Sequence, residues 1–360
     1  MFPGLFEQPL KERKKEGLHS VKNPVLIIVV PCYNEEEVLK ETAKELSHVL
    51  KRLASEKLIA AYSKILFVDD GSSDRTWELI IEEKNTNPFV TGLKLARNVG
   101  HQKALLAGLE MAKTKADCVI SIDADLQDDT TVIREFILKF HEGFDIVHGV
   151  RRKRDTDTFF KRTTALCFYS LMRRIGINLI PNHADFRLMS KRALHELSRY
   201  KEANVFLRGI VPLIGFKSTN VFYDRKERLA GKTKYPLKKM LAFAFEGITS
   251  FSIVPIRFVT LLGFLSFFIG GMAGSYALIQ ELLGNTKSGW TSLMISIWLI
   301  GGLQLMGIGL IGEYIGKIFN EVKRRPMYTV ETDLFTGAFT RRPSKKYRLL
   351  AAKELKKRGS

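Results

Sequence analysis

Two aspartates, Asp123 and Asp125, stand one residue apart directly after a short apolar run at residues 118–122. A run that is apolar on both faces and rich in β-branched residues is typical of a buried parallel strand, which presents ligands at its carboxyl end. Two acidic groups there repel each other and are costly to desolvate unless a cation or hydrogen-bond donors compensate them. The pair therefore indicates either a site for a hard divalent cation or a helix cap or turn, since aspartate favours both.

Side chains able to bind a ligand also follow two earlier apolar runs, at residues 25–30 and 65–68. They are Pro31, Tyr33 and Glu35 after the first run, and Asp69 and Asp70 after the second. Carboxylates at strand ends can accept the N–H of a base or the hydroxyls of a ribose, and Gly71 lets a ligand approach the backbone. Taken alone, the second group is also typical of a turn. Three strand ends that carry acidic groups favour a common ligand site.

Glycine-rich phosphate loops are absent from the sequence. No G-x-G-x-x-G follows the first apolar run, and no G-x-x-x-x-G-K-[ST] occurs anywhere. Dinucleotide-binding and P-loop interpretations therefore lose their main support. A nucleoside diphosphate site without such a loop needs a cation and basic side chains, and the sequence supplies both kinds of group.

The elements that position these residues alternate between strands and helices. Strand-like runs lie at residues 25–30, 65–68, 92–95, 118–122 and 145–150, and helical patterns at 35–53, from 74, at 102–112 and at 131–142. Regular β/α alternation predicts an α/β fold with a parallel sheet covered by helices and a site at the carboxyl edge.

The size and charge of the chain narrow its class. The chain has 360 residues, 45% of them hydrophobic, which is enough for a large core and more than one structural unit. Its formal net charge is +19. The basic residues crowd the two ends and the flanks of the apolar segments, with no basic face of interleaved aromatic residues. This distribution suits an anionic membrane surface and argues against nucleic-acid binding.

Three scattered cysteines, Cys32, Cys118 and Cys167, are too few for a disulfide framework or a zinc site. We interpret them as reduced core residues of a cytosolic domain. Residues 1–23 contain no apolar core of the kind that a secretory signal needs. The large N-terminal part is therefore expected to stay in the cytoplasm.

Two uncharged segments, residues 258–279 and 290–312, are each long enough to cross roughly 30 Å of hydrocarbon. Basic residues flank the pair on its outer sides, at Lys238, Lys239, Arg257, Lys317, Lys323, Arg324 and Arg325. The positive-inside bias predicts a transmembrane hairpin with both ends in the cytoplasm. Its glycines allow close contacts either within one hairpin or between copies of the chain. Residues 236–252 mix lysines with a Leu/Phe face, which fits an interfacial helix or an ordinary amphipathic helix.

Six ordered motifs together resemble the family 2 glycosyltransferases that act on polyprenyl phosphates. They are V-P-C-Y-N-E-E (30–36), V-D-D-G-S-S-D (68–74), L-A-R-N-V-G-H-Q-K-A-L-L-A-G-L (95–109), D-A-D-L-Q-D (123–128), A-D-F-R-L-M-S (184–190) and R-L-A-G-K-T-K-Y (228–235). The hairpin, with E-G-I-T-S-F-S and I-G-E-Y-I-G, is similar to the branch of bactoprenol glucosyltransferases, and dolichyl-phosphate mannose synthase is a more distant relative.

The resemblance covers about residues 24–330 and implies a domain plan. The parts are a basic N-terminal segment (1–23), a GT-A catalytic domain (24–235), an interfacial amphipathic helix (236–256), the transmembrane hairpin (257–316) and a basic cytoplasmic tail (317–360). The two basic ends are not explained by the resemblance. It also implies a multi-pass protein of the inner (plasma) membrane and a homo-oligomer, a tetramer.

The resemblance further implies a site for a nucleotide sugar and a Mg²⁺ or Mn²⁺ ion. The nucleotide-sugar residues it implies are Pro31, Tyr33, Glu35, Asp69, Asp70, Lys103, Asp123, Arg228 and Lys234. Asp123, Asp125 and Gln127 would surround the cation with the oxygen ligands that such ions prefer. Arg228 and Lys234 would close over the phosphates once both substrates are bound.

The acceptor phosphate of a polyprenyl lipid would be held by a separate basic group. The residues implied are Arg151, Lys161, Arg162, Thr164 and Arg187. Some relatives place a serine where this chain has Thr163, Thr164 and Ala165, so the hydroxyl contact differs. Asp123, Asp125, Arg151, Lys161 and Arg162 are the residues expected to act in catalysis.

Charge suggests the mechanism. A lipid monophosphate has a second pKa of about 6, so its oxygen is already an anionic nucleophile at neutral pH and needs no general base. In-line displacement at the anomeric carbon then inverts its configuration, and the cation and basic side chains stabilise the departing nucleoside diphosphate.

Several alternatives stay open at the level of sequence. UDP-glucose is the donor that the resemblance favours, with GDP-mannose and UDP-aminoarabinose types as alternatives. A processive polysaccharide synthase would carry more membrane spans and a Q-x-x-R-W motif, which is absent. A non-catalytic membrane scaffold would be expected to carry ionisable groups inside its spans, and residues 258–279 and 290–312 contain none.

Overall fold

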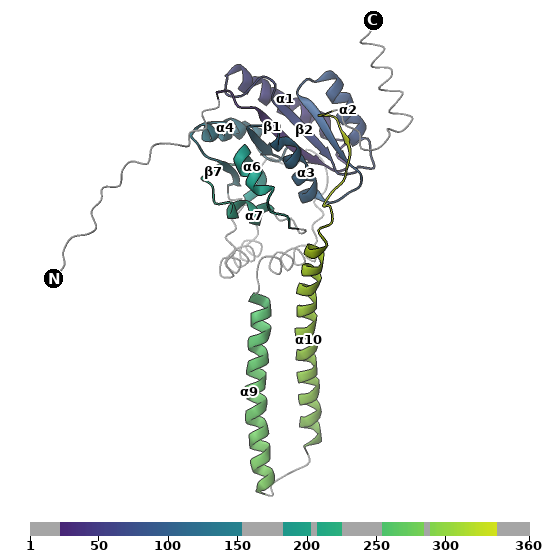
Figure 1. Cartoon of the computed structure of the whole chain (residues 1–360), viewed down its shortest axis with the longest axis vertical. Coiled ribbons are helices and arrows are strands. Elements are labelled where there is room, and N and C mark those ends of the chain that lie inside the picture. The colour runs from purple at the N-terminus through teal and green to yellow at the C-terminus, as the bar shows by residue number, and fades with distance from the viewer. Residues whose placement is uncertain (1–21, 153–182, 203–206, 225–253, 284–288, 337–360) are drawn as a thin grey trace, which may run out of the picture.

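The computed structural model describes residues 22–152, 183–202, 207–224, 254–283 and 289–336. They form an α/β domain built on one sheet and two long helices that extend away from it (Figure 1). The predicted segments 1–23 and 236–256 lie largely outside the described residues, and the predicted tail is described only for residues 317–336.

One sheet of eight strands organises the domain. The strands are β1 (Leu26–Cys32), β2 (Lys64–Asp69), β3 (Val90–Leu95), β4 (Cys118–Ser121), β5 (Ile146–Arg151), β6 (His183–Ser190), β7 (Ser218–Tyr223) and β8 (Val330–Asp333). Their order is β7-β5-β6-β4-β1-β2-β3-β8. Strands β3, β2, β1 and β4 pair in parallel, β6 runs antiparallel to β4 and β5, and β7 is parallel to β5. This arrangement confirms the predicted α/β fold with a mainly parallel sheet.

Helices cover both faces of the sheet. They are α1 (Leu39–Ser55), α2 (Thr76–Thr86), α3 (His101–Lys113), the 3₁₀ turn η1 (Thr130–Val132), α4 (Ile133–His141), α6 (Lys191–Leu197) and α7 (Leu207–Leu213). Apolar residues of α1, α2 and α4 pack on one face, and those of α3, α6 and α7 on the other. Every residue of β1 and β4 is buried as a result. This double burial explains why these strands read as continuous apolar runs in the sequence.

Helix α3 lies unusually close to the sheet because residue 108 has no side chain. A Cβ added at Gly108 would lie 2.4 Å from Val29 Cγ1 and 2.7 Å from Val68 Cγ2. Such distances are far below ordinary contact, so a larger residue would push α3 off β1 and β2. The close packing fixes the amino end of α3 next to the carboxyl ends of these strands.

Two long helices, α9 (Val254–Leu282) and α10 (Trp290–Lys323), cover the segments predicted at 258–279 and 290–312. The prediction that both segments are helical is therefore confirmed. Both expose large apolar side chains, such as Phe264 and Leu305. In the part of the chain that the structure describes, no helix combines the length and the apolar character needed to cross a membrane. The membrane-spanning part of the prediction is not supported by this finding.

The chain after α10 returns to the sheet, which the sequence analysis did not predict. Strand β8 pairs antiparallel with β3, and the Leu334 N–H donates to the Gly92 carbonyl at 2.9 Å. Tyr328 donates a hydrogen bond to Glu110 of α3. The predicted tail from residue 317 therefore begins as the last turns of α10 and continues, through residue 336, as part of the globular domain. The tail prediction rested on charge, whereas backbone pairing and a few apolar side chains decide the position of this segment.

Candidate active site

The polar residues identified by sequence gather at the carboxyl ends of β1, β2 and β4 and at the amino end of α3. The loops after β1 and β2 are tied together, because the Asn34 N–H donates to Ser72 Oγ at 3.0 Å and the Ser73 N–H donates to Asn34 Oδ1 at 2.9 Å. Asn34 has a φ of 54°, in the left-handed region that asparagine tolerates. The expected convergence of strand ends is thus confirmed.

The loop after β4 carries Asp123, Asp125 and Gln127. Between the last two, Leu126 has a φ of 51°, a left-handed conformation that costs about 1–2 kcal/mol for a residue with a Cβ. The Gln127 N–H donates to Asp125 Oδ1 at 3.3 Å, and the Gln127 side chain is buried. Backbone strain that the surroundings maintain is a feature of functional loops.

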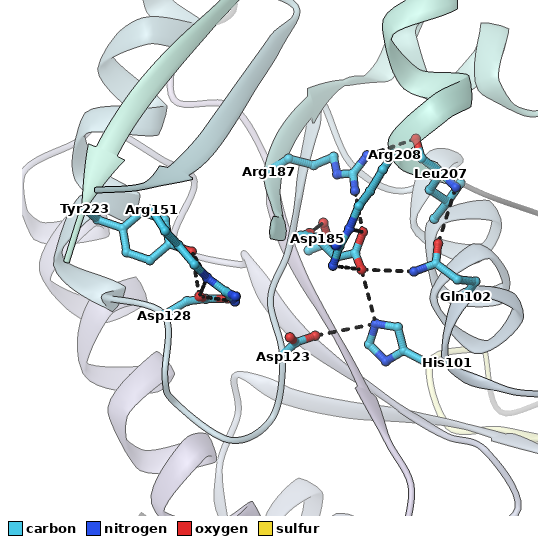
Figure 2. Close-up of polar contacts among 11 residues, drawn as sticks. His101, Gln102, Asp123, Asp128, Arg151, Asp185, Arg187, Leu207, Arg208 and Tyr223 are labelled. Carbon is cyan, nitrogen blue, oxygen red and sulfur yellow. Dashed lines mark hydrogen bonds and ion pairs between the residues drawn. The ribbon is translucent and has the colours of Figure 1, made fainter. Parts of the chain in front are cut away.

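Asp123 has one carboxylate oxygen that no donor of the described residues compensates. Its side chain is about one-third exposed, but its Oδ1 atom is shielded from solvent and has no hydrogen-bond partner among the described residues. His101 Nε2 lies 3.5 Å from this oxygen (Figure 2). Burial raises the pKa of Asp123 to about 6, and the negative charges of Asp128, Asp185 and Asp125 contribute to the increase. The Asp123 carboxylate is therefore short of compensating donors among the described residues.

A second carboxylate, Asp185 on β6, lies at the centre of a network of donors (Figure 2). It accepts hydrogen bonds from Gln102 Nε2 at 2.9 Å, Arg187 at 2.6 Å and Arg208 at 3.1 Å. His101 Nε2 lies 3.7 Å away, so this imidazole stands between Asp185 and Asp123. Burial raises the pKa of Asp185, but the charges of Arg187 and Arg208 outweigh it and hold the pKa below its ordinary value.

Arg187 does not occupy the position expected for a ligand of the acceptor phosphate. Its side chain is 1% exposed, and its guanidinium donates to Asp185 and, at 3.2 Å, to the Leu207 carbonyl. Its Nε has no partner among the described residues. Burial lowers the pKa of Arg187, and the Asp185 charge opposes this change. The predicted phosphate role is therefore not supported, because the side chain is committed to the interior.

Arg151, by contrast, ends β5 at the site and remains partly exposed. Its Nε and Nη2 donate to Asp128 Oδ1 at 3.2 and 2.9 Å, and Tyr223 donates to the same oxygen at 2.5 Å. Burial lowers the pKa of Arg151, but the Asp128 charge more than offsets this and the pKa is raised overall. The guanidinium therefore stays charged, and it lies against the Asp128 carboxylate (Figure 2).

The residues predicted to bind the nucleoside lie at the ends of β1 and β2. Asp70 accepts hydrogen bonds from the N–H groups of Val99 and Gly100 at 2.8 and 2.9 Å, which anchor the loop before α3. Asp69 Oδ2 is buried without a partner among the described residues, and burial raises the pKa of both aspartates. Asp69 Oδ2 can therefore still accept a hydrogen bond from a ligand, whereas both oxygens of Asp70 accept from backbone N–H groups.

The other predicted nucleotide-sugar residues differ in exposure. Pro31 is buried within β1, Glu35 is partly exposed, and Tyr33 presents 47% of its surface. Lys103 is partly exposed on the first turn of α3, close in sequence to His101. Lys161, Arg162, Thr164, Arg228 and Lys234 lie outside the described residues, so their predicted roles stay predictions.

Sequence reasoning missed several residues of the site as the structure has it. They are His101, Gln102, Asp128, Asp185, Arg208 and Tyr223. His101 and Gln102 stand in the motif at 95–109, Asp128 ends D-A-D-L-Q-D, and Asp185 belongs to the motif at 184–190, so the motifs carried a signal. Arg208 and Tyr223 lie outside every motif, and only tertiary proximity identifies them.

The donor set fits a divalent cation that is shared with a substrate. Among the described residues, no group of three or more histidine, cysteine and acidic side chains is arranged to hold a metal ion by itself. Mg²⁺ is commonly held by one or two carboxylates together with substrate phosphates, rather than by an all-protein cage. The unpartnered, buried Oδ1 of Asp123 and the adjacent Asp125 match that arrangement.

Comparison with known proteins places this site in a family. Residues 27–198 match the model of Glycosyl transferase family 2. YkoT of Bacillus subtilis, described as an uncharacterized glycosyltransferase, is 71% identical over 312 residues, which cover 87% of this chain and 93% of that protein. The bactoprenol glucosyl transferase of Shigella phage SfII is 40% identical over 306 residues, covering 84% of this chain and 96% of that protein.

Among solved structures, mannosyl-3-phosphoglycerate synthase from Rubrobacter xylanophilus aligns with a TM-score of 0.42 and 15% identity, covering 62% of this chain and 71% of that one. The sequence relatives are far closer, and they extend over nearly their whole length. The chain is therefore a glycosyltransferase of family 2, and it belongs to the branch of that family that contains the bactoprenol glucosyl transferases.

Proposed function

We propose that this protein transfers glucose from UDP-glucose to a polyprenyl phosphate such as undecaprenyl phosphate, with inversion at the anomeric carbon. The observation that carries the proposal is a pair of oppositely charged groups at the same end of the sheet: the acidic group around Asp123, and Arg151 at the end of β5, held by Asp128 of the Asp123 loop. Relatives named bactoprenol glucosyl transferase, about 40% identical, support this acceptor and this sugar. The product would serve cell-envelope glycan or lipid modification.

Asp123, Asp125 and Gln127 would hold a Mg²⁺ or Mn²⁺ ion against the diphosphate of the donor. Such an ion neutralises the charge that develops on the departing nucleoside diphosphate. The raised pKa of Asp123 means that its carboxylate has few compensating partners in the protein alone. His101 would limit the repulsion between Asp123 and Asp185, because its Nε2 lies within 3.7 Å of both.

The donor nucleoside would lie across the ends of β1 and β2. Asp69 offers a buried oxygen without a partner among the described residues, which suits the N–H of a base, and the exposed ring of Tyr33 offers an apolar face. Lys103 is placed on α3 to reach a donor phosphate. Arg228 and Lys234 would complete the enclosure when both substrates are present.

The acceptor phosphate would lie against Arg151, together with Lys161, Arg162 and Thr164. A phosphate oxygen that is already anionic attacks the anomeric carbon, so no side chain needs to remove a proton. The positive charges of Arg151 and Lys161 would reduce the repulsion between the acceptor phosphate and the donor diphosphate. This division of roles predicts separate effects on the two Michaelis constants when either side of the site is changed.

The acceptor is a membrane lipid, so we also propose that the protein acts at the cytoplasmic face of the inner membrane. The apolar side chains exposed along α9 and α10 support contact with lipid, and the basic flanks support contact with anionic headgroups. An oligomer, as the resemblance implies, remains part of this proposal.

The decisive experiment is transfer by the purified full-length protein with a panel of nucleotide sugars, undecaprenyl phosphate and Mg²⁺ or Mn²⁺. We expect a mass that corresponds to hexosyl undecaprenyl phosphate with UDP-glucose, and loss of product when a chelator is added. If product forms only with another nucleotide sugar, the sugar of that donor takes the place of glucose in the proposal. Absence of product with every donor from a folded protein would refute the proposal, and retained anomeric configuration would refute the inverting mechanism.

A further inference from the structure

The group formed by Arg151, Asp128 and Tyr223 has a geometry that a simple surface ion pair lacks. Arg151 and Tyr223 are the last residues of β5 and β7 and are register partners across the parallel pair. Asp128 comes from the loop after β4, three residues beyond Asp125. The group therefore joins two strand ends to the loop that carries the acidic residues, as the left part of Figure 2 shows.

The hydrogen bonds of this group converge on one atom. Asp128 Oδ1 accepts from Arg151 Nε at 3.2 Å, from Arg151 Nη2 at 2.9 Å and from the Tyr223 hydroxyl at 2.5 Å. The side chain of Asp128 is 1% exposed, whereas that of Arg151 is 26% exposed. A buried acceptor thus holds the Nε and Nη2 edge of a guanidinium whose side chain is itself partly exposed.

Tyr223 is itself fixed by packing. Its ring contacts Phe186 edge-on, with centroids 5.5 Å apart, and only 2% of the residue is exposed. Its hydroxyl also lies 3.3 Å from Arg151 Nε. An anchored tyrosine that donates to Asp128 restricts the rotation of the carboxylate, and the carboxylate in turn restricts the guanidinium.

We propose that Asp128 and Tyr223 are positioning residues that hold the Arg151 guanidinium in one orientation, so that its Nη1 edge is presented to the anionic group of the acceptor. The inference rests on the proposed function for the identity of that group, a lipid phosphate. Arginine binds phosphate best when its planar fork is already oriented, because less conformational entropy is lost on binding. Among the described residues, Nη1 of Arg151 forms no hydrogen bond, which leaves it for the substrate.

The first test is kinetic and uses Asp128→Asn and Tyr223→Phe, which keep the size of each side chain. We expect the KM for polyprenyl phosphate to rise about tenfold in each variant, as for loss of a hydrogen bond to a charged group, with the KM for the nucleotide sugar and kcat within about twofold of wild type. Asp224→Asn is the matched control, because Asp224 pairs with the neighbouring Arg152 at 3.5 Å but is 78% exposed. That variant should leave all three constants unchanged.

Combination with Arg151→Lys tests whether the two residues act through Arg151. If they do, Asp128→Asn should raise the acceptor KM by less than about twofold in the Arg151→Lys background, since the oriented fork is already lost. Full additivity of the two substitutions would overturn the proposal. The proposal would also be overturned if Asp128→Asn changed only the concentration of Mg²⁺ or Mn²⁺ needed for activity. Asp128 would then support Asp125 and not Arg151.

A second measurement does not depend on catalysis. The Nε–H resonance of Arg151 in protein labelled with ¹⁵N-arginine, assigned by its loss in Arg151→Lys, should exchange slowly with water in the wild type and at least about tenfold faster in Tyr223→Phe. Unchanged exchange would overturn the positioning role. If the wild type transfers no sugar to any polyprenyl phosphate, the proposed function fails, while this measurement still decides whether the group holds Arg151.

Discussion

At the scale of single residues, the site depends on how each carboxylate is compensated. Asp185 has two arginines and a glutamine as donors, whereas Asp123 has His101 at 3.5 Å and an oxygen without a hydrogen-bond partner among the described residues. Loss of a compensated carboxylate leaves its buried partners with an unpaired charge, whereas an under-compensated carboxylate can still accept a cation. The pKa of Asp185 is lowered and that of Asp123 is raised, in agreement with these two roles.

The proposed metal role of Asp125 predicts a loss of activity without a loss of fold. Asp125→Asn removes a charge from a partly exposed position, so we expect transfer to fall by at least about 100-fold while the melting temperature stays within a few degrees. The rate of glycolipid formation and thermal unfolding measure the two effects. Asp129→Asn, on the same loop, is the control, since an amide oxygen can still accept from the Thr131 N–H. Activity of Asp125→Asn near that of wild type would remove the metal role.

The buried network predicts a large effect on stability at Asp185. Asp185→Asn leaves Arg187, which is 1% exposed, without its carboxylate, and we expect a loss of about 3–5 kcal/mol in the free energy of unfolding. Glu196→Gln breaks the exposed pair with Arg199 and should cost no more than about 0.5 kcal/mol. Denaturant unfolding of both variants makes the comparison.

The Asp185 network also predicts a pH dependence. The pKa of Asp185 is lower in the folded protein than its ordinary value, so its contribution to stability is present above the unfolded pKa and declines as the pH falls. The difference between wild type and Asp185→Asn should therefore be complete at pH 7 and shrink below about pH 4. A difference that is constant from pH 7 to pH 3 would contradict this account.

Residue types at strand ends sufficed to predict which acidic side chains lie together. Asp123, Asp125 and Asp69 were identified because carboxyl ends of parallel strands meet at one edge. Arg187 was assigned to the acceptor phosphate because a motif does not indicate whether an arginine side chain is buried or exposed. In the structure the side chain is buried and donates to Asp185. Burial of this kind depends on which strands pair, and a single sequence does not contain that information.

At the scale of elements, the alternating pattern predicted β1 to β5 and α1 to α4 with boundaries within a few residues, because each has its own hydrophobic period. Strands β6, β7 and β8 were not predicted. β6 inserts antiparallel between β4 and β5, and β8 joins β3 from more than 200 residues away in the chain. Pairings of such long range are set by tertiary structure and leave no local pattern.

Two glycines near the site test how tightly the loops are packed. Gly71 and Gly100 both have positive φ, but a Cβ at Gly71 would lie 2.7 Å from the backbone of Arg97 and Asn98, whereas nothing lies within 4 Å of one at Gly100. We expect Gly71→Ala to destabilise the protein by about 1–3 kcal/mol more than Gly100→Ala, because only the former adds a clash to the backbone strain. Equal unfolding free energies for the two variants would show that the loop backbone near residue 71 shifts to accommodate the added Cβ.

At the scale of the whole molecule, the apolar surface of the two long helices predicts association with lipid. Replacing Phe264 and Phe268, which are 61% and 64% exposed, by aspartate should reduce co-sedimentation with liposomes of anionic lipid by at least about tenfold. Tyr62→Asp, at a residue 67% exposed on the catalytic domain, is the matched control and should have no effect. An equal effect of both changes would attribute binding to general surface charge.

The position of β8 has a mechanical consequence for the catalytic domain. β7 and β8 are the two outermost strands of the sheet, and in the chain the helices α9 and α10 follow the first and precede the second. Only the six residues 324–329 separate the end of α10 from the start of β8. Because β8 pairs with β3, a tilt of α10 would pull directly on the β3 edge of the sheet. Any movement of this long helix is thus passed to the catalytic domain through one edge strand.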